Sequence, residues 1–583
     1  MNTIKNNTLA LSLILSFLLI QGYSQSNKKP ISELFKNKIE IYFSFDIKDR
    51  KELHTLTKII SIDNVQDKTV HAYANQKQFK KFAELKYKYT ILTNPSELIK
   101  DPKMLNLEDF KKRGVEAWDS WPTYSTYVAM MNKFQTDFPS ICKLETIGTL
   151  TSGHKLLALK ISKNVNKREY EPQFLYNSSI HGDEITGYVL MLRYIDYLLT
   201  NYGTNPKITS ILDNSEIYIC PLANPDGTFA GGDNTVAGAT RSNKNGIDMN
   251  RNYPDPQDGL HPDGEVYQQE TQMYMTFAKN HDFVMAVTFH GGAETINYPW
   301  DTWNRVSPDI KWWTYISKMY ADTAKLNSPS GYLTDPNASG ITNGYAWYEV
   351  NGGRQDYMNV WQHCREVTIE LSGDKTPAAS KLPNFWNYNY KSFLNLLKQS
   401  LCGIKGIVTD SCTGKPIRAK LTINNYDKDS TEVYSSLPIG NYHRPIYNGT
   451  YSLTFSAPGY NSKTINNVTA TNGNIVIRDV KLVCKSVDIT ELGNNYYISL
   501  YPNPSNGTFN IDIEANGSIN NDNHNQCRLE IIDLLGNILD TKNVILNKND
   551  TPVTFNLSNY SSGLYLAKIM FDEKTILKKI VIQ

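Results

Sequence analysis

The sequence predicts a multidomain α/β protein whose central domain carries a largely parallel sheet covered by helices. Beyond Gly403 the pattern changes to short β-rich runs broken by Gly, Pro and Asn, which is typical of β-sandwiches. The chain has 583 residues, and single hydrophobic cores stop growing at about 250–300 residues, so several domains are expected. In the middle of the chain, apolar runs typical of buried strands alternate with a helical pattern: FLYNSS, EIYICPL, FVMAVTFH and EVTIEL with EITGYVLMLRYIDYLL.

Residues 1–25 are predicted to be a secretory signal peptide. A lysine precedes an apolar run from about Leu9 to Ile20, and small and polar residues follow, so cleavage is expected near Ser24 or Gln25. The run is short for a membrane span, and an uncleaved anchor is the alternative. No other apolar stretch of the sequence is long enough to cross a bilayer, and the net charge of +2 gives no indication of nucleic-acid binding.

Residues 26–115 are predicted to form a small α/β domain. The period of the apolar residues changes repeatedly between that of a strand and that of a helix. The expected strands are 38–47, 69–75 and 89–94, and the expected helices are 48–60 and 76–87.

Two β-sandwich domains are predicted at 402–484 and 498–583, joined by a linker at 485–497. The seven cysteines are few for an exported chain of this size, so stability is expected to come mainly from hydrophobic cores with at most a few disulfides. Cys402 with Cys412, which would close a short loop at a domain start, is one candidate pair.

Three residues have the spacing of a catalytic zinc site. His181 and Glu184 stand three positions apart in NSSIHGDE, and His290 closes the predicted strand AVTFH about a hundred residues later. Zinc takes nitrogen and oxygen ligands tetrahedrally, and a catalytic site keeps three protein ligands so that the fourth position is open to water or substrate. An HxxE pair alone arises often by chance, so the neighbouring motifs carry the argument.

Those motifs repeat the pattern of one family. TRSNKNGIDMNRNYPD lies between the proposed ligands, and NGYAWYEVNGGRQDY and EVTIEL follow them. With these blocks in this order, residues 116–400 resemble the zinc metallocarboxypeptidases, and within them the regulatory N/E subfamily that includes carboxypeptidases D, E, M and N. The resemblance implies a twisted eight-stranded mixed sheet flanked by helices, with one zinc ion. The short matches are NPDG at 224–227, NRNYP at 250–254, HGG at 290–292, NYPWD at 297–301 and GITNGYAWY at 340–348.

The resemblance assigns catalytic roles that fit the chemistry of each residue. Glu370 is the expected general base, since a carboxylate in the otherwise apolar strand EVTIEL is expected to be paired or working. Arg241 matches the residue that stabilises the oxyanion beside the metal. Asp248 matches the aspartate that hydrogen-bonds the first ligand histidine and fixes its tautomer.

A carboxypeptidase must also recognise the free C-terminal carboxylate of its substrate. A guanidinium fork binds a carboxylate in bidentate fashion, and Arg251 with Asn250 fills this role in the resemblance. Tyr348 matches the mobile tyrosine that closes over the substrate terminus.

Asp301 and Gln355 match the positions that hold a basic C-terminal side chain in the regulatory subfamily. A buried carboxylate would select Arg or Lys by charge pairing. The alternative for Asp301 is an exposed aspartate in a turn at a strand end. Arg354, beside Gln355, stands where the family commonly has methionine, and its effect depends on whether its side chain reaches the pocket.

The flanking domains have resemblances of their own. Residues 402–484 resemble the transthyretin-like domain that follows the catalytic domain in the regulatory subfamily, with a structural role expected and carbohydrate binding as the alternative. Residues 498–583, with YPNPSNGTF and the end KKIVIQ, resemble the C-terminal sorting domain of type IX secretion. The alternative for this segment is an ordinary adhesive β-sandwich. The segment 26–115 has the position of a prosegment, which the regulatory subfamily usually lacks. An inhibitory propeptide and a plain structural domain both remain open.

Three functions remain at this stage. The first is an exported or cell-surface zinc carboxypeptidase that acts on the C-termini of peptides and proteins, preferring Lys or Arg, and uses the type IX machinery for export. The second is a zinc amidase of the same fold acting on cell-wall peptides. The third is an inactive surface-binding scaffold, which the intact ligands, base and arginines argue against.

Overall fold

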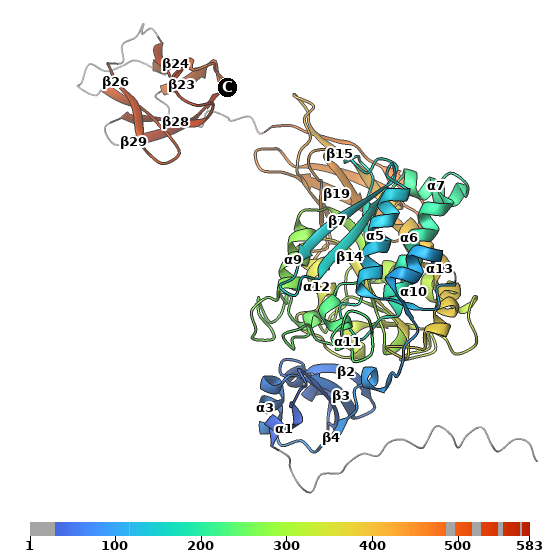
Figure 1. Ribbon diagram of the computed structural model, residues 1–583. Helices are drawn as coiled ribbons and strands as arrows, with labels where there is room; N and C mark the ends of the chain where they lie inside the picture. Colours follow the sequence, from blue (N-terminus) through green and yellow to red (C-terminus); the bar gives the residue numbers. More distant parts are fainter. Residues whose placement is uncertain (1–29, 116, 485–495, 516–525, 546–551, 572–573) are drawn as a thin grey trace, which may run out of the picture. The chain divides into compact units, whose positions relative to one another are not determined.

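The computed structural model describes residues 30–115, 117–484, 496–515, 526–545, 552–571 and 574–583. The chain divides into two compact units, Met1–Val483 and Cys484–Gln583 (Figure 1). The predicted signal peptide and most of the predicted linker lie outside the described residues. Among the described residues, no helix is both long enough and apolar enough to cross a membrane.

The first part of the larger unit is a four-stranded antiparallel sheet with its own core. The sheet order is β2-β3-β1-β4, and phenylalanines from β1 meet those of α3 in a buried cluster with Phe43 and Phe82 at its centre. The sequence predicted one helix over 48–60, but there is only a single 3-10 turn followed by a four-residue helix, because the chain must turn into β2 at Ser61. The elements are α1 (Ile31–Leu34), β1 (Ile41–Asp46), α2 (Leu53–Leu56), β2 (Ser61–Gln66), β3 (Thr69–Ala74), α3 (Gln76–Glu84) and β4 (Tyr89–Leu92).

A short connection leads to the central sheet. Strand β5 (Met104–Leu105) pairs in parallel with β6 (Trp121–Pro122), and α4 (Leu107–Arg113) lies between them in the sequence.

The centre of the larger unit is an eight-stranded mixed sheet, which confirms the expectation from the resemblance. Its order is β13-β12-β14-β11-β9-β10-β8-β7, and the four middle strands β14, β11, β9 and β10 run parallel. The strands are β7 (Cys142–Thr149), β8 (Lys155–Ile161), β9 (Gln173–Ser178), β10 (Glu216–Cys220), β11 (Phe283–His290), β12 (Ala293–Tyr298), β13 (Ile341–Asn343) and β14 (Arg365–Ser372).

Helices cover both faces of this sheet. Successive residues of a strand point to opposite faces, so Phe174 and Tyr176 of β9 enter one buried cluster while Leu175 enters the other. The first cluster is closed by α5 (Tyr124–Asp137), α6 (Thr186–Asn201), α7 (Pro206–Asp213), α10 (Ile310–Lys325) and α13 (Leu382–Gln399), and the second by α9 (Gln269–Lys279) and α12 (Arg354–Trp361). Because both faces are covered, the middle strands are buried along their whole length, which explains their continuous apolar sequences.

The remainder of the larger unit is β-rich, as predicted. Its two sheets enclose one apolar cluster, and Arg444 fixes it to the preceding domain through a buried ion pair with Asp309 at 2.9 Å. A second ion pair, with Asp427 of its own domain at 2.7 Å, holds the Arg444 guanidinium. The strands are β15 (Gly403–Asp410), β16 (Lys420–Ile423), β17 (Val433–Tyr434), β18 (Asn441–Arg444), β19 (Gly449–Ser456), β20 (Lys463–Ala470), β21 (Ile475–Ile477) and β22 (Val480–Leu482).

The second unit is also β-rich, in agreement with the sequence. It has sheets β23-β24-β27 and β26-β25-β28-β29 around an apolar cluster that includes Phe509, Leu529 and Ile569. The strands are β23 (Tyr496–Tyr501), β24 (Thr508–Ala515), β25 (Gln526–Ile532), β26 (Ile538–Ile545), β27 (Val553–Asn556), β28 (Gly563–Phe571) and β29 (Lys574–Ile582).

The candidate disulfide between Cys402 and Cys412 is wrong, since both residues are thiols in the structure. The Cys402 thiol donates to the Lys398 carbonyl at 3.3 Å, and the Cys412 sulfur lies 3.7 Å from the Ser411 hydroxyl. Stability of the described part therefore rests on the buried apolar clusters.

Candidate active site

The parallel strands bring the three proposed ligands together at their carboxyl ends. His181 and Glu184 lie in the loop between β9 and α6, and His290 is the last residue of β11, which neighbours β9 in the sheet. The loop passes so close to α8 (Pro225–Thr228) that a Cβ on Gly182 would stand 2.4 Å from a backbone atom of Gly227. A glycine is therefore required between the two ligands of HGDE.

The donor atoms form a small triangle that fits a zinc ion. The Nδ1 atoms of His181 and His290 lie 3.1 Å apart, and each lies 2.9 Å from Oε2 of Glu184. Tetrahedral ligands about 2.0 Å from a zinc ion are separated by about 3.3 Å. Burial lowers the pKa of His290 to about 4, so its imidazole is neutral, which is the form that binds metals. These three buried residues are the one group in the described part of the chain with metal-binding geometry.

Asp248 and Arg241 hold the side chains of this triangle in position through hydrogen bonds. The Nε2 atom of His181 lies 3.1 Å from Oδ1 of Asp248, which leaves Nδ1 facing the other ligands. Arg241 donates from Nε to Asp248 at 3.1 Å and from Nη1 to Glu184 at 2.9 Å. Although burial opposes it, the charges of His181, Arg241 and Arg251 hold the pKa of Asp248 well below its usual value.

Glu370 faces the same space from the neighbouring strand. It pairs with His290 across the parallel β11–β14 ladder and is 9% exposed. Its Oε2 is buried and has no hydrogen-bond partner in the protein, so one carboxylate oxygen remains available to a bound molecule. Burial raises the pKa of Glu370 well above its usual range, and the Glu184 carboxylate adds to the rise.

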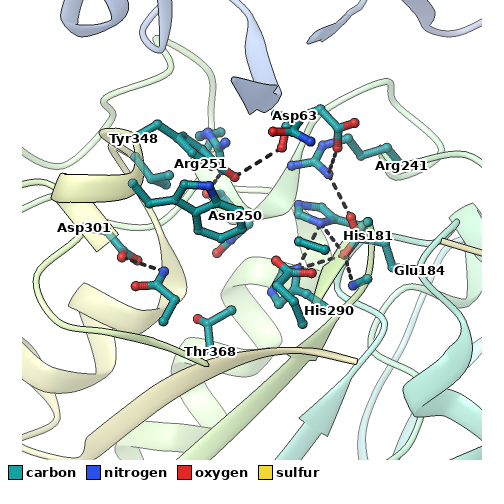
Figure 2. Close-up of a pocket in the computed structure, with 18 residues that line it drawn as sticks. Asp63, His181, Glu184, Arg241, Asn250, Arg251, His290, Asp301, Tyr348 and Thr368 are labelled. Atoms are coloured by element: carbon teal, nitrogen blue, oxygen red, sulfur yellow. Dashed lines mark hydrogen bonds and ion pairs between the residues drawn. The ribbon is translucent and has the colours of Figure 1, made fainter. Parts of the chain in front are cut away.

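Arg251, Asn250 and Tyr348 line the cavity on the side away from the ligands (Figure 2). Arg251 is 5% exposed, and its Nε is a buried donor with no acceptor in the protein. Its Nη1 donates to the Asn250 carbonyl at 2.9 Å, which fixes the plane of the guanidinium. Tyr348 directly follows α11 (Gly344–Trp347).

Asp301 forms the end of the cavity opposite Arg241 (Figure 2) and is buried rather than exposed in a turn. Its Oδ1 accepts from Asn297 at 3.0 Å and from Gln355 at 2.9 Å. Burial raises the pKa of Asp301 to about 7, because the hydrogen bond from Asn297 and the charge of Arg251 only partly offset the loss of water. A Cβ on Gly344 would stand 1.8 Å from Oδ1 of Asp301, so this glycine keeps the space above the carboxylate open.

Two predicted residues lie behind the cavity wall. Gln355 does not line the cavity and holds Asp301 from the far side. Arg354 also points away: it forms a buried ion pair of 3.0 Å with Glu366, and its guanidinium lies over the ring of Tyr274. The arginine that replaces the family methionine therefore adds no positive charge to the pocket.

Several residues of the site were not found by sequence reasoning. Lys375, five positions after Glu370, places Nζ 3.2 Å from Oε1 of Glu184, and Thr368 of β14 lines the cavity. Asp63 and Asn64 of β2 also line it, although they are far away in the sequence. No local motif marks Lys375 or Asp63, because each has a role only through the residues that face it.

Comparison with known proteins agrees with this geometry. Residues 127–392 match the zinc carboxypeptidase family, residues 403–483 match the carboxypeptidase regulatory-like domain, and residues 499–583 match a secretion system C-terminal sorting domain.

The chain aligns with a different share of each relative's length. Carboxypeptidase D of Mus musculus is 35% identical over 378 residues, which is 61% of this chain and 26% of that protein, so the chain spans about a quarter of this relative. Carboxypeptidase M of Mus musculus is 32% identical, with 57% of this chain and 77% of that protein covered. The carboxypeptidase N catalytic chain of Mus musculus is 31% identical, with 59% and 81% covered. A solved carboxypeptidase A from Helicoverpa armigera superposes with a TM-score of 0.48 at 15% identity, covering 61% of this chain and 97% of that one.

Proposed function

Because the chain belongs to the zinc carboxypeptidase family, we propose that it hydrolyses the C-terminal peptide bond of peptides and proteins. One observation carries this proposal. A buried His-Glu-His triangle, a carboxylate with a free oxygen and an arginine with an unpaired donor all face one cavity. A metal hydrolase that reads a terminal carboxylate needs these three parts.

Zinc held by His181, Glu184 and His290 would act as a Lewis acid on the scissile carbonyl and on water. Glu370 takes a proton from the attacking water and delivers it to the leaving amine nitrogen. The carbon–nitrogen bond then breaks, giving a shortened peptide with a new carboxylate and a free amino acid. Arg241 supplies positive charge where the carbonyl oxygen becomes an anion.

Recognition of the chain end is assigned to Arg251, Asn250 and Tyr348. The guanidinium offers its unpaired Nε together with an Nη group to the terminal carboxylate. Tyr348, which lines the same cavity, is assigned to close over the bound residue. This arrangement restricts cleavage to the last peptide bond, because a longer chain has no carboxylate at that point.

The preferred C-terminal residue is Arg or Lys. The cavity ends on the Asp301 carboxylate, which is 4% exposed, and a cationic side chain that reaches it forms a charge-assisted hydrogen bond in a site with little water. Gln355 acts through Asp301 by fixing the position of its oxygens. Arg354 is neutralised by Glu366 and does not oppose a basic side chain.

The sorting domain at 499–583 indicates export to the cell surface or beyond, and we assign the type IX machinery as its partner. The regulatory-like domain is assigned a structural role. Its two sheets are fastened to the catalytic domain through the buried Arg444–Asp309 pair rather than left as an independent module.

The test is release of the last residue from matched peptides ending in Arg, Lys, Leu, Phe or D-Ala. Zinc-loaded enzyme should release Arg and Lys fastest, a chelator should abolish release, and added zinc should restore it. Glu370→Gln should lower kcat by about 10²- to 10⁴-fold with bound zinc unchanged. Fastest release of D-Ala would favour an amidase for cell-wall peptides, and no release of any residue by zinc-containing protein would refute the proposal.

A further inference from the structure

The middle of strand β2 of the N-terminal domain lies in the cavity of the catalytic domain. Asp63 and Asn64 line the same space as the three proposed ligands, and Figure 2 shows Asp63 directed at Arg241 beside the His-Glu-His triangle. The remaining cavity has a volume of about 30 Å³. This holds only a few water molecules and has no room for a substrate residue.

The Asp63 carboxylate is held between two cations. Its Oδ1 lies 2.5 Å from Nζ of Lys375 and 3.2 Å from Nη1 of Arg241, and all three side chains are at most 10% exposed. Both cations also contact Oε1 of Glu184, so the Asp63 carboxylate is anchored directly beside a proposed zinc ligand. Charge-assisted contacts of this kind, shielded from water, are the strong ones.

The backbone of β2 occupies the groups assigned to substrate recognition. Arg251 donates from Nη2 to the Ile62 carbonyl at 2.9 Å, and the Tyr348 hydroxyl donates to the Asp63 carbonyl at 3.4 Å. Ser61 contacts Asp248, which orients the first ligand histidine. Three consecutive residues of one strand, Ser61 to Asp63, therefore contact the groups assigned to the oxyanion, to the terminal carboxylate and to closure over the substrate.

The rest of the contact is mainly polar, although Tyr348 of the catalytic domain also packs against the apolar core of the N-terminal domain. Glu40 accepts from the backbone N–H of Arg241 at 2.8 Å and of Ser242 at 2.9 Å, and Lys58 forms an ion pair with Asp258 at 2.8 Å. The buried apolar core of the N-terminal domain consists of its own residues between Phe35 and Phe82. The domain thus has a buried core of its own and is attached by mainly polar contacts, which is what a removable cover requires.

We propose that the N-terminal domain is a built-in inhibitor, in which β2 occupies the substrate site and Asp63, clamped by Arg241 and Lys375, is its anchor. This rests on the proposed peptidase function of the same site. The domain must move off, or be cut away, before a peptide can bind.

The experiment compares zinc-loaded full-length protein carrying Asp63→Lys with wild type and with Asp67→Lys. Asp67 is an exposed residue just beyond the end of β2, so the control makes the same charge change away from the site. Asp63→Lys places a third cation against two others and should raise kcat/KM for an Arg-ended peptide by about 10- to 100-fold. Asp67→Lys should match wild type. The isosteric Asp63→Asn, which disturbs folding less, should shift kcat/KM in the same direction by a smaller factor.

A second readout does not depend on turnover. In zinc-loaded Glu370→Gln, a saturating Arg-ended peptide should increase hydrogen exchange at the backbone amides of 61–66, because the peptide displaces β2. If wild type is fully active, Asp63→Lys has the same activity, and the peptide does not change hydrogen exchange at 61–66, the inhibitor proposal is wrong. The proposed peptidase function would still stand. If no variant releases a residue and no peptide binds, the proposed function itself fails, and the inhibitor fails with it.

Discussion

Replacing Asp301 with asparagine should remove the preference for a basic C-terminal residue. The change keeps the size of the side chain and its contact with Asn297 but removes the charge from the end of the cavity. Removing one partner of a buried, hydrogen-bonded charge pair costs about 2–5 kcal/mol, and 1.36 kcal/mol corresponds to tenfold in rate. For Arg-ended peptides, kcat/KM should therefore fall by about 30-fold or more, while Leu-ended peptides should change by less than about threefold.

The pH dependence gives the same prediction a second check. Burial raises the pKa of Asp301 to about 7, so in the free enzyme this carboxyl is mostly protonated below pH 7 and charged above it. Binding of a cationic side chain needs the charged form. For wild type, the kcat/KM for Arg-ended peptides divided by that for Leu-ended peptides should therefore rise by about tenfold per pH unit below 7 and level off above it, because ionisation of the general base Glu370 affects both peptides equally and cancels in this ratio. Asp301→Asn should lose this step.

The assay is steady-state release of the C-terminal residue from peptides identical except at that residue, between pH 5 and 9, with bound zinc measured for each protein. The Leu-ended peptide serves as the control, because its binding does not need the Asp301 charge. Equal losses on Arg-ended and Leu-ended peptides would refute the reasoning, since the carboxylate would then support the fold of the site rather than select the substrate.

Four further changes test other parts of the structure. Asp248→Asn should weaken zinc binding by about 10- to 100-fold in chelator competition, because it orients a ligand histidine. Arg251→Lys should lower kcat/KM by at least about tenfold on all peptides, since an ammonium cannot make two parallel hydrogen bonds to a carboxylate. Gly344→Ala should slow Arg-ended peptides selectively, because its Cβ would meet Asp301. Arg444→Met should lower the free energy of unfolding by about 3–5 kcal/mol in a denaturant titration, because buried Asp427 loses its ion pair and Asp309 keeps only the one with Arg365.

The sequence alone was enough to predict the central sheet and the three residues that have metal-binding geometry in the structure. The middle strands are apolar along their whole length because both faces are covered, and this signal is local. His181, Glu184 and His290 were predicted from their spacing and from the family motifs around them, and their places at or just after strand ends, where parallel strands converge, agreed with that prediction. The change to short strands beyond Gly403 was equally local. The strands were predicted from patterns of neighbouring residues, and the three ligands from short motifs in a fixed order along the chain.

Strand β2 was missed because SIDNVQ lacks the apolar alternation of a half-buried strand. Its polar residues are buried by the catalytic domain, which sequence periodicity within the N-terminal domain cannot report. The direction of the Arg354 side chain was likewise decided by its ion pair with Glu366, twelve residues later in the sequence. No sequence pattern assigns this partner, because buried charges pair through space and not along the chain.

The sequence by itself predicted the chemistry of the site: which residues would bind metal, which carboxylate would act as base and which arginine would meet a chain end. Those predictions depend on short motifs whose residues and order resemble those of the zinc carboxypeptidases. Only the tertiary structure decided what surrounds that chemistry: that Asp301 is buried and its pKa raised, that Lys375 stands beside Glu184, and that Asp63 lies in the cavity. Burial and long-range charge pairing are properties of the folded chain, and no local pattern encodes them.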